Sequence, residues 1–401
     1  MTAILTLNAG SSSVKFSVYF SDDGLSPQAH GQVESIGTSA RLSLQHGEAH
    51  TKKPVAADSQ AAALSVILEA IEPALKGHRV SGIGHRVVHG GQDFDGPALL
   101  TRAIVSQLKA LSPLAPLHQP ANLAGVAAAK EAFPNAIQVA CFDTAFHRNH
   151  PWVNDTFALP RDLYDQGIRR YGFHGLSYQY ITENLRKDAP DIAKGRVIVA
   201  HLGNGASMCA LNDCVSIGST MGFSALDGLP MGTRCGQLDP GVILYLLDQG
   251  MSAEDITTLL YKESGLKGLS GISHDMRTLL SSKTREARQA DDYFTFRLRR
   301  EIGAMAAVLG GIDALVFCGG IGEHAPSIRS DAVRDLDYLG LRVHEPANQR
   351  NESVISSGRV PILIIPTDEE RVIAKATQQF LCAAEPHLDD TASPNKMRAA
   401  R

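Results

Sequence analysis

Alternating apolar and polar residues open the chain with the pattern of a β-hairpin. Two apolar runs, 4–7 and 14–19, flank a polar turn rich in Asn, Gly and Ser, which is the composition of a tight connection between strands. The same pattern returns at residues 197–211. The corresponding glycines, Gly10 and Gly205, lie almost half a chain length apart. The repeat predicts two related halves that each begin with strand, turn and strand.

The rest of the chain alternates between helical and strand patterns. Apolar residues recur at helical spacing in some segments and form short β-branched runs in others. Helices are predicted at 59–75, at 290–310 and after Thr367, and strands at 136–142, 314–318 and 360–365. This alternation predicts an α/β fold, and the 401 residues are enough for two domains. The polar tail beyond Glu385 is expected to fray.

Composition excludes several classes of protein. The net charge of −4 and the single Trp argue against a nucleic-acid-binding surface, which needs clustered Lys/Arg and stacking aromatic rings. The N-terminus lacks the basic region of a signal peptide, and the apolar stretch 303–322 is interrupted by Asp313, so no membrane span is expected. The six cysteines form no CxxC pair; we expect buried, reduced thiols more than disulfides or zinc ligands. These features predict a soluble cytoplasmic protein.

Glycine-rich turns follow three apolar strands, at 8–13, 203–207 and 319–323. Glycine lets backbone N–H groups approach an anion because no Cβ intervenes. The third turn is expected to lead into a helix start near Glu323, whose dipole favours an anion. Neither GxxxxGK[ST] nor GxGxxG occurs in the sequence. A tight structural turn explains any single case, but three such turns on a duplicated frame favour one split phosphate site.

Arginine and histidine residues stand in unusual surroundings. Arg86 lies in GHRVVHGG, His118 between two prolines, His174 between glycines and Arg234 in MGTRCG. A His85/His89 zinc pair is disfavoured because no further ligand lies at ligand spacing. Phosphoryl transfer to an alcohol needs a base that takes the hydroxyl proton. A carboxylate acceptor is already anionic, so it needs positive groups that reduce its repulsion from the phosphate. The Arg and His inventory therefore favours phosphoryl transfer to a small anion.

The ordered motifs resemble acetate kinases, the ATP:carboxylate phosphotransferases of the actin/Hsp70/sugar-kinase superfamily. The matching segments run in family order from residue 4 to about 370, and together they are highly specific. They are NAGSSSVK at 8–15, GHRVVHGG at 84–91, APLHQPAN at 115–122, FDTAFH at 142–147, RYGFHG at 170–175, HLGNG at 201–205, MGTR at 231–234, SGISHDMR at 270–277 and GGIGE at 319–323.

The resemblance implies a role for each matched position. Asn8 and Glu369 would organise Mg²⁺, with Mn²⁺ as an alternative, although acidic residues at 367–370 also suit a helix start. Asp143, His174 and Arg234 would be catalytic, Asp143 in an orienting or metal-organising role because the acceptor needs no base. The acyl substrate would contact Arg86, Val88, Leu117, His118 and Phe173. Val88, Leu117 and Phe173 are equally well explained as core residues. His118 also suits a loop residue held by hydrogen bonds. ATP or ADP would meet Ser11, Ser12, Lys15, His201, Gly203, Asn204, Gly205, Asp275, Met276, Arg277, Gly320, Ile321, Gly322, Glu323 and His324.

The resemblance also implies architecture and partners. We expect two similar actin-like (ribonuclease H-like) domains with a central cleft: residues 1–149 with about 370–401 on the acyl side, and 150–369 on the nucleotide side. The resemblance implies a homodimer. It also implies that the substrate is acetate or another short-chain carboxylate. Relatives often have Pro at the position of Ala225. A change in the acyl pocket there makes a propionate or butyrate kinase an alternative. His324, where relatives usually have Asn, is expected to add pH sensitivity near the nucleotide. A non-catalytic regulator on the same fold is the alternative from another class.

Overall fold

The computed structural model describes residues 2–10 and 12–384 and divides the chain into two compact units. The first unit takes the described residues of Met1–Gly90, Gly96–Phe142 and Glu369–Arg401, and the second takes Gly91–Asp95 and Asp143–Asp368. Ser11 and the tail expected to fray lie outside the described residues. Among the residues that are described, none of the helices has the length and apolar character to cross a membrane.

The first unit is built on an eight-stranded sheet in the order β5-β4-β3-β2-β1-β6-β8-β7. Strands β1, β6 and β8 are parallel to one another, and β2 to β5 continue from β1 as antiparallel neighbours. Its elements are β1 (Thr2–Ala9), β2 (Ser13–Phe20), β3 (Pro27–Glu34), β4 (Arg41–His46), β5 (Ala49–Pro54), α1 (Gln60–Leu75), β6 (Arg79–Val87), β7 (Ala98–Leu99), α2 (Arg102–Ala110), η1 (Ser112–Leu114), α3 (Gln119–Ala132), β8 (Ile137–Phe142) and α16 (Glu369–Ala384).

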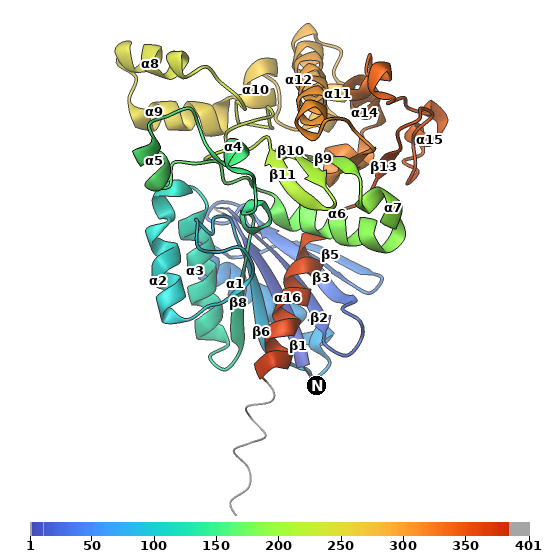
Figure 1. The fold of residues 1–401 in the computed structure, drawn as a ribbon. Coiled ribbons are helices and arrows are strands. Elements are labelled where there is room, and N and C mark those ends of the chain that lie inside the picture. Colours follow the sequence, from blue (N-terminus) through green and yellow to red (C-terminus); the bar gives the residue numbers. More distant parts are fainter. Residues whose placement is uncertain (1, 11, 385–401) are drawn as a thin grey trace, which may run out of the picture. The chain divides into compact units, whose positions relative to one another are not determined.

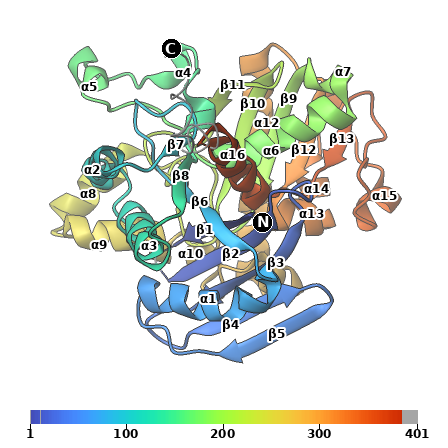
Figure 2. The ribbon, with the colours of Figure 1, turned by 90° about the horizontal axis from the view of Figure 1, so that it is seen from below.

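Helices cover both faces of this sheet because successive side chains on a strand point to opposite sides. On one face Leu5 and Ile83 are buried with Ile67 of α1. On the other face Ile4 packs with Ala374 of α16. Figure 2 shows α16 and the pair α1 and α3 on opposite faces. Helix α1 starts where Ser59 accepts a hydrogen bond from the Ala62 N–H, as expected for a helix N-cap.

The second unit is built on a five-stranded sheet in the order β11-β10-β9-β12-β13. Helices α6 and α12 lie on its two faces (Figure 1). Its elements are η2 (Ala145–His147), α4 (Trp152–Asp155), α5 (Arg161–Asp165), α6 (Gly175–Asp188), α7 (Pro190–Ala193), β9 (Arg196–Leu202), β10 (Ala206–Asn212), β11 (Val215–Ser219), α8 (Pro240–Asp248), α9 (Ala253–Thr258), the π-helix η3 (Leu259–Glu263), α10 (Gly265–Ser270), α11 (Met276–Ser281), α12 (Arg285–Leu309), β12 (Ala314–Cys318), α13 (Gly319–His324), α14 (Pro326–Val333), η4 (Asp337–Leu339), α15 (Glu345–Gln349) and β13 (Ile362–Ile364).

The two sheets share one topology. In each, a hairpin (β1-β2, or β9-β10) is extended on one side by an antiparallel strand and on the other by two parallel strands. The order β3-β2-β1-β6-β8 in the first unit therefore corresponds to β11-β10-β9-β12-β13 in the second. The prediction of two related halves is confirmed, but only the first unit opens with the hairpin, because η2 and α4 to α7 precede β9 in the second.

Two expectations need correction. The segment 319–323 is not a turn, because α13 begins directly at Gly319 when β12 ends. Gly319 has φ +75°, and a Cβ there would lie 2.8 Å from the Leu202 carbonyl oxygen, so only glycine lets the strand pass into the helix. The six cysteines are free, but Cys382 is exposed and Cys235 only partly buried.

Candidate functional site

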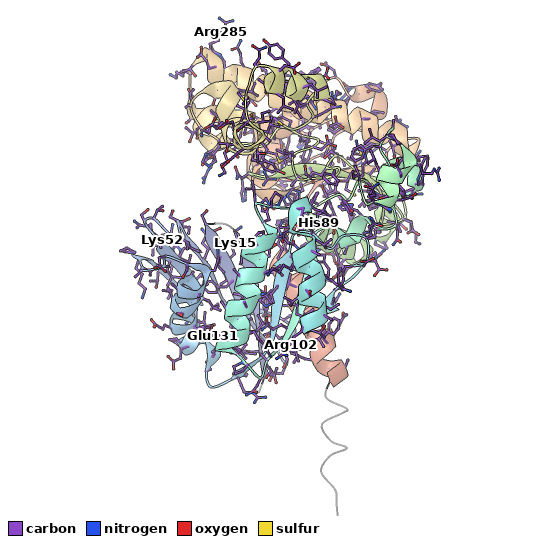
Figure 3. The ribbon with its side chains drawn as sticks, turned by 90° about the vertical axis from the view of Figure 1, so that its left-hand side faces the viewer. Lys15, Lys52, His89, Arg102, Glu131 and Arg285 are labelled. Atoms are coloured by element: carbon purple, nitrogen blue, oxygen red, sulfur yellow. The ribbon has the colours of Figure 1, made fainter. Side chains whose placement is uncertain are left out.

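The candidate residues of the first unit gather at one edge of its sheet. Parallel strands end at a common edge, where α/β proteins bind ligands, and Asn8 and Arg86 lie at the carboxyl ends of β1 and β6. Lys15 on β2 pairs with Asn8 in the strand register and is exposed. Figure 3 shows Lys15 at the same edge as His89, far from Glu131 at the end of α3.

Asn122 on α3 links two of these strand ends, a role that sequence reasoning missed. Its amide nitrogen donates to the Ala9 carbonyl at 2.5 Å, and its amide oxygen accepts from the Val88 N–H at 3.0 Å. The side chain is 3% exposed, so both bonds are sheltered from water. Asn122 therefore holds the chain beyond β1 and the chain beyond β6 in fixed positions. Asn122 is the last residue of the APLHQPAN motif, but no role was predicted for it.

Arg86 and Glu369 are paired with each other. The Arg86 Nη1 lies 3.3 Å from Glu369 Oε2, and the two side chains are 19% and 13% exposed. Glu369 is the first residue of α16, and Arg86 is the penultimate residue of β6. The residue expected to bind the acyl carboxylate therefore holds a carboxylate of the protein itself, the one expected to bind Mg²⁺.

The remaining candidates of this unit lie in loops next to the same edge. Val88 follows β6, and Leu117 and His118 lead into α3; all three are partly buried. Ser12 is exposed just before β2. The positions of Val88, Leu117 and His118 suit either lining a site or loop packing, and their roles stay predictions.

In the second unit His174 is held in a strained position at the start of α6. Its φ is +57°, in the left-handed region that non-glycine residues seldom occupy. The N–H of the next residue, Gly175, donates to the carbonyl of Asp143 at 2.9 Å. A Cβ on Gly175 would lie 2.3 Å from that oxygen. The hydrogen bond between Gly175 and Asp143 connects the backbone next to His174 with Asp143. Asp143 itself is 2% exposed.

Two hydroxyl groups orient the His174 ring. Tyr178 Oη lies 2.5 Å from Ser207 Oγ, which lies 2.8 Å from His174 Nδ1. Ser207 is the hydrogen-bond acceptor that the buried Tyr178 hydroxyl reaches among the described residues, so in a neutral His174 ring Ser207 donates to Nδ1. The proton of His174 is then on Nε2. A Cβ on Gly205 would lie 3.1 Å from this Nε2, which places the N–H beside the 203–205 turn.

The 203–205 turn connects β9 to β10 and touches the loop that carries Arg234. The turn closes on itself where the Gly203 N–H donates to the Gly205 carbonyl at 2.9 Å. The Gly232 N–H donates to the Asn204 carbonyl at 3.1 Å, and Arg234 Nη1 is 3.9 Å from a Cβ built on Gly205. The predicted phosphate turn, His174 and Arg234 are therefore neighbours.

Backbone hydrogen bonds to the start of α10 hold the Arg234 loop. The Leu266 and Lys267 N–H groups donate to the carbonyls of Met231 and Gly232, both at 2.9 Å. This close approach requires Gly265, which has φ +62° and whose Cβ would lie 2.1 Å from the Met231 carbonyl oxygen. Arg234 Nη1 donates to the Ala225 carbonyl at 3.1 Å, so Ala225 lies beside the guanidinium group.

The Asp275–Arg277 segment caps α11 with an exposed ion pair. Asp275 accepts from the Arg277 N–H at 2.9 Å and from Arg277 Nη2 at 2.6 Å. The Arg277 hydrogen bond lowers the pKa of Asp275. The carbonyl of His274 is 3.2 Å from a Cβ built on Gly232. The segment that includes Met276 therefore starts next to the Arg234 loop, while the Arg277 side chain is 91% exposed.

Helix α13 carries the last predicted nucleotide segment. Glu323 Oε1 accepts from the N–H groups of Gly319 and Thr367, at 2.8 and 3.2 Å. Gly320 is exposed, Ile321 is partly buried and Gly322 is buried. Because Glu323 is committed to these backbone bonds, it shapes the segment. The His324 side chain is 74% exposed.

Two further residues support this edge of the second sheet, and sequence reasoning missed both. Ser177 Oγ lies 2.8 Å from His201 Nδ1 and 2.9 Å from Thr367 Oγ1, which connects the end of β9 to the chain after β13. The His201 ring stacks on His174 with centroids 4.3 Å apart. Arg329 of α14 is fully buried and donates to the Gly322 carbonyl at 2.8 Å.

The oxygen donors for a metal are few. The described residues contain no group of three or more His, Cys, Asp or Glu side chains that could hold an ion. Asn8 and Glu369 supply one amide and one carboxylate. Mg²⁺ commonly binds one or two protein carboxylates and takes its other ligands from phosphates and water. The residues present therefore fit a magnesium ion that arrives with a nucleotide.

The chain resembles known proteins along nearly its whole length. The sequence profile described as the Acetokinase family matches residues 3–375. A relative named acetate kinase from Methylocella silvestris is 53% identical, over 94% of this chain and 98% of its own length. The crystal structure of acetate kinase from Porphyromonas gingivalis matches with a TM-score of 0.86 at 34% identity, covering 95% of this chain and 100% of that chain. A propionate kinase structure from Francisella tularensis subsp. tularensis gives 0.89 at 37% identity, with 94% and 100% covered.

Proposed function

The chain belongs to the acetokinase family, and we propose that it transfers the γ-phosphoryl group of ATP reversibly to acetate. A carboxylate oxygen forms the new bond to phosphorus, the bond to the bridging oxygen of ADP breaks, and the products are acetyl phosphate and ADP. The observation that carries the proposal is the neighbourhood of His174, Arg234 and the 203–205 turn. It brings the Arg234 guanidinium group and the His174 Nε2 to the same turn, which suits a transferring phosphoryl group.

Each unit has its part in this proposal. Arg86 binds the acyl carboxylate by the bidentate geometry that arginine favours. His174 Nε2–H and Arg234 stabilise the negative charge on the phosphoryl oxygens, and Asp143 orients the reactants and does not act as a base. Asn8 and Glu369 would hold Mg²⁺, which supplies charge neutralisation on the nucleotide phosphates. Homodimer formation and a cytoplasmic location are further proposals that rest on the resemblance.

The test is direct. Purified protein with ATP, Mg²⁺ and acetate is expected to form an acyl phosphate that hydroxylamine traps as a hydroxamate. The Arg234→Ala variant should still bind ATP but lose turnover by about 10²- to 10³-fold, the loss typical of removing one charge-stabilising donor. Absence of hydroxamate with the wild-type protein would contradict the proposed reaction.

A longer acyl substrate is the second candidate, because Ala225 lies beside Arg234 where relatives often have Pro. One extra methylene changes selectivity by about 1–3 kcal/mol. Comparing kcat/KM for acetate, propionate and butyrate in the wild type and in Ala225→Pro decides between the candidates. A propionate kinase would prefer the three-carbon acid in the wild type and lose that preference in the variant.

A further inference from the structure

A buried histidine that the proposed mechanism does not use contacts the backbone next to His174. His147, at the end of η2, is fully buried. Its Nε2 lies 2.9 Å from the Phe173 carbonyl oxygen, and its Nδ1 lies 2.8 Å from Ser216 Oγ on β11. A Cβ on Gly172 would lie 2.6 Å from the imidazole ring. The ring therefore packs directly against the chain that leads to His174.

The hydrogen bonds around His147 have one consistent direction. A carbonyl oxygen only accepts, so Nε2 must carry the proton that it gives to Phe173. In a neutral ring Nδ1 is then the acceptor, and Ser216 donates to it. Ser216 Oγ in turn accepts from His150 Nε2 at 2.7 Å and also contacts Cys209 Sγ at 3.2 Å. The alternative tautomer of His150 would leave a buried N–H at Nδ1 without a hydrogen-bond acceptor among the described residues.

Electrostatics agree with neutral rings. Burial is the largest cause that lowers the pKa of His147 to about 3, and the neighbouring His150 and Arg148 lower it further. Burial likewise lowers the pKa of His150 to about 4, with Arg148 and Arg170 contributing. Near neutral pH the relay from His150 through Ser216 to His147 carries no charge, and its direction does not change.

We propose that His147 is a positioning residue for the Phe173–His174 segment. The short stretch 143–147 holds this segment on both sides of His174: the Asp143 carbonyl accepts from Gly175, and His147 Nε2–H donates to Phe173. These two hydrogen bonds fix the left-handed backbone of His174. The hydrogen bonds from His150 to Ser216 and from Ser216 to His147 keep the proton of His147 on Nε2. The functional part of the inference rests on the proposed phosphoryl transfer, in which His174 contacts the reacting group.

Two matched variants separate positioning from packing. The amide of His147→Gln reaches the place of Nε2 and keeps the donor to Phe173, whereas His147→Asn reaches only the place of Nδ1. We expect kcat to fall on the order of 10²-fold in His147→Asn, the effect of a displacement near 1 Å, and to stay within about threefold of wild type in His147→Gln. KM for ATP should change little in either. The same pair of substitutions at His50, exposed on β5, serves as the control.

A purely structural role predicts equal losses of kcat in the two His147 variants, in proportion to their loss of thermal stability, and that outcome overturns the proposal. Nitrogen-15 NMR of the wild-type protein gives a second test that needs no variant. His147 is expected to show a protonated Nε2 and a bare Nδ1 from pH 6 to 8; a protonated Nδ1 overturns the proposal. Because this spectrum does not depend on turnover, failure to form acyl phosphate would count against the proposed function alone.

Discussion

At the residue scale, the orientation of the His174 ring depends on the buried hydroxyl groups of Ser207 and Tyr178. Ser207 and Tyr178 put the imidazole proton on Nε2, beside the 203–205 turn. In a neutral ring, this arrangement leaves Nε2–H as a hydrogen-bond donor that is already oriented. Preorganised donors are effective because they need no rearrangement when charge develops.

The Ser207→Ala variant tests this arrangement. Without the Ser207 proton, Nδ1 of His174 is no longer restricted to the role of acceptor and the ring can take either tautomer. We expect kcat to fall by about tenfold, which corresponds to about 1.4 kcal/mol, with little change in KM for acetate. Ser65→Ala, a surface substitution on α1, is the control. Unchanged kcat in Ser207→Ala would mean that the tautomer is set elsewhere.

The Arg86–Glu369 ion pair leads to a prediction with two opposite effects. In Glu369→Gln, Arg86 loses its internal carboxylate and is more available to the substrate. KM for acetate should fall about fivefold, about 1 kcal/mol for a pair of this kind, while the Mg²⁺ concentration needed for half-maximal rate rises. Glu131→Gln at the far end of α3 is the matched control. A rise in KM for acetate would show that Glu369 does not compete for Arg86.

The sequence pointed to Arg86, His174 and Arg234 as candidate site residues but not to the residues that support them. Arg86, His174 and Arg234 stood out because glycines flank them in apolar surroundings. Asn122, Ser207 and Ser177 did not, because a polar residue inside a helix or strand has no local signal that distinguishes a buried hydrogen bond from solvent exposure. Their partners are far away in the chain, for example Ala9 for Asn122. Such pairs are determined by tertiary packing.

At the element scale, the approach of α10 to the Arg234 loop is governed by Gly265. Gly265 and Gly250 both have positive φ, but a Cβ on Gly250 would meet nothing within 4 Å. Alanine at Gly250 should therefore cost only the backbone strain, about 1 kcal/mol, and leave kcat unchanged.

The Gly265→Ala variant adds a steric clash with the carbonyls of Met231 and Arg234. We expect a loss of stability beyond that of Gly250→Ala by about 1–3 kcal/mol and a fall in kcat, because the loop that carries Arg234 must shift. Urea unfolding and initial rates on the two variants give the comparison. Equal stability and activity in both would exclude a role of the close contact.

Element types were predictable where the apolar pattern was long or repeated. The two hairpins and the helices at 60–75 and 285–309 follow the expected positions within a few residues. The start of α13 was not predictable from composition, because Gly319–Gly320 reads as a turn. Only the neighbouring strand β9, whose Leu202 carbonyl leaves no room for a Cβ, explains why glycine stands there in a helix.

At the scale of the whole molecule, buried histidines make stability depend on pH. Burial lowers the pKa of His85 to about 4, and that of His147 and His150 to about 3 and 4. In the unfolded chain all three titrate near pH 6.5, so between pH 6.5 and 4 the unfolded state binds more protons. The free energy of unfolding should therefore fall as the pH drops below 6.5, at most about 4 kcal/mol per pH unit.

Urea unfolding at pH 7.5 and 5.5 checks this expectation. The second unit holds two of the three histidines and the first unit one, so the transition of the second unit should shift more. In His85→Gln the pH dependence of the first unit should weaken by the contribution of one proton. Stability that is the same at both pH values would show that these rings become protonated in the folded protein.

The duplicated topology could be foreseen from the sequence, but the unequal sheets could not. Hairpin repeats marked the two halves because the turn chemistry recurs at Gly10 and Gly205. The three extra strands β4, β5 and β7 of the first unit left no such mark. Strands β4 and β5 have few buried positions, so their pattern resembles that of a polar surface segment.

The position of α16 has a consequence for synthesis on the ribosome. Residues Gly82 and Gly84 of β6 pack against Ile373 and Thr377 of this helix, so one face of the first sheet is uncovered until α16 has been made. At about 5–20 residues per second, the delay between β6 and α16 is roughly a quarter of a minute to one minute. The second unit, whose residues all precede α16, can fold in that interval. The nascent N-terminal half meanwhile exposes an apolar sheet face to molecular chaperones.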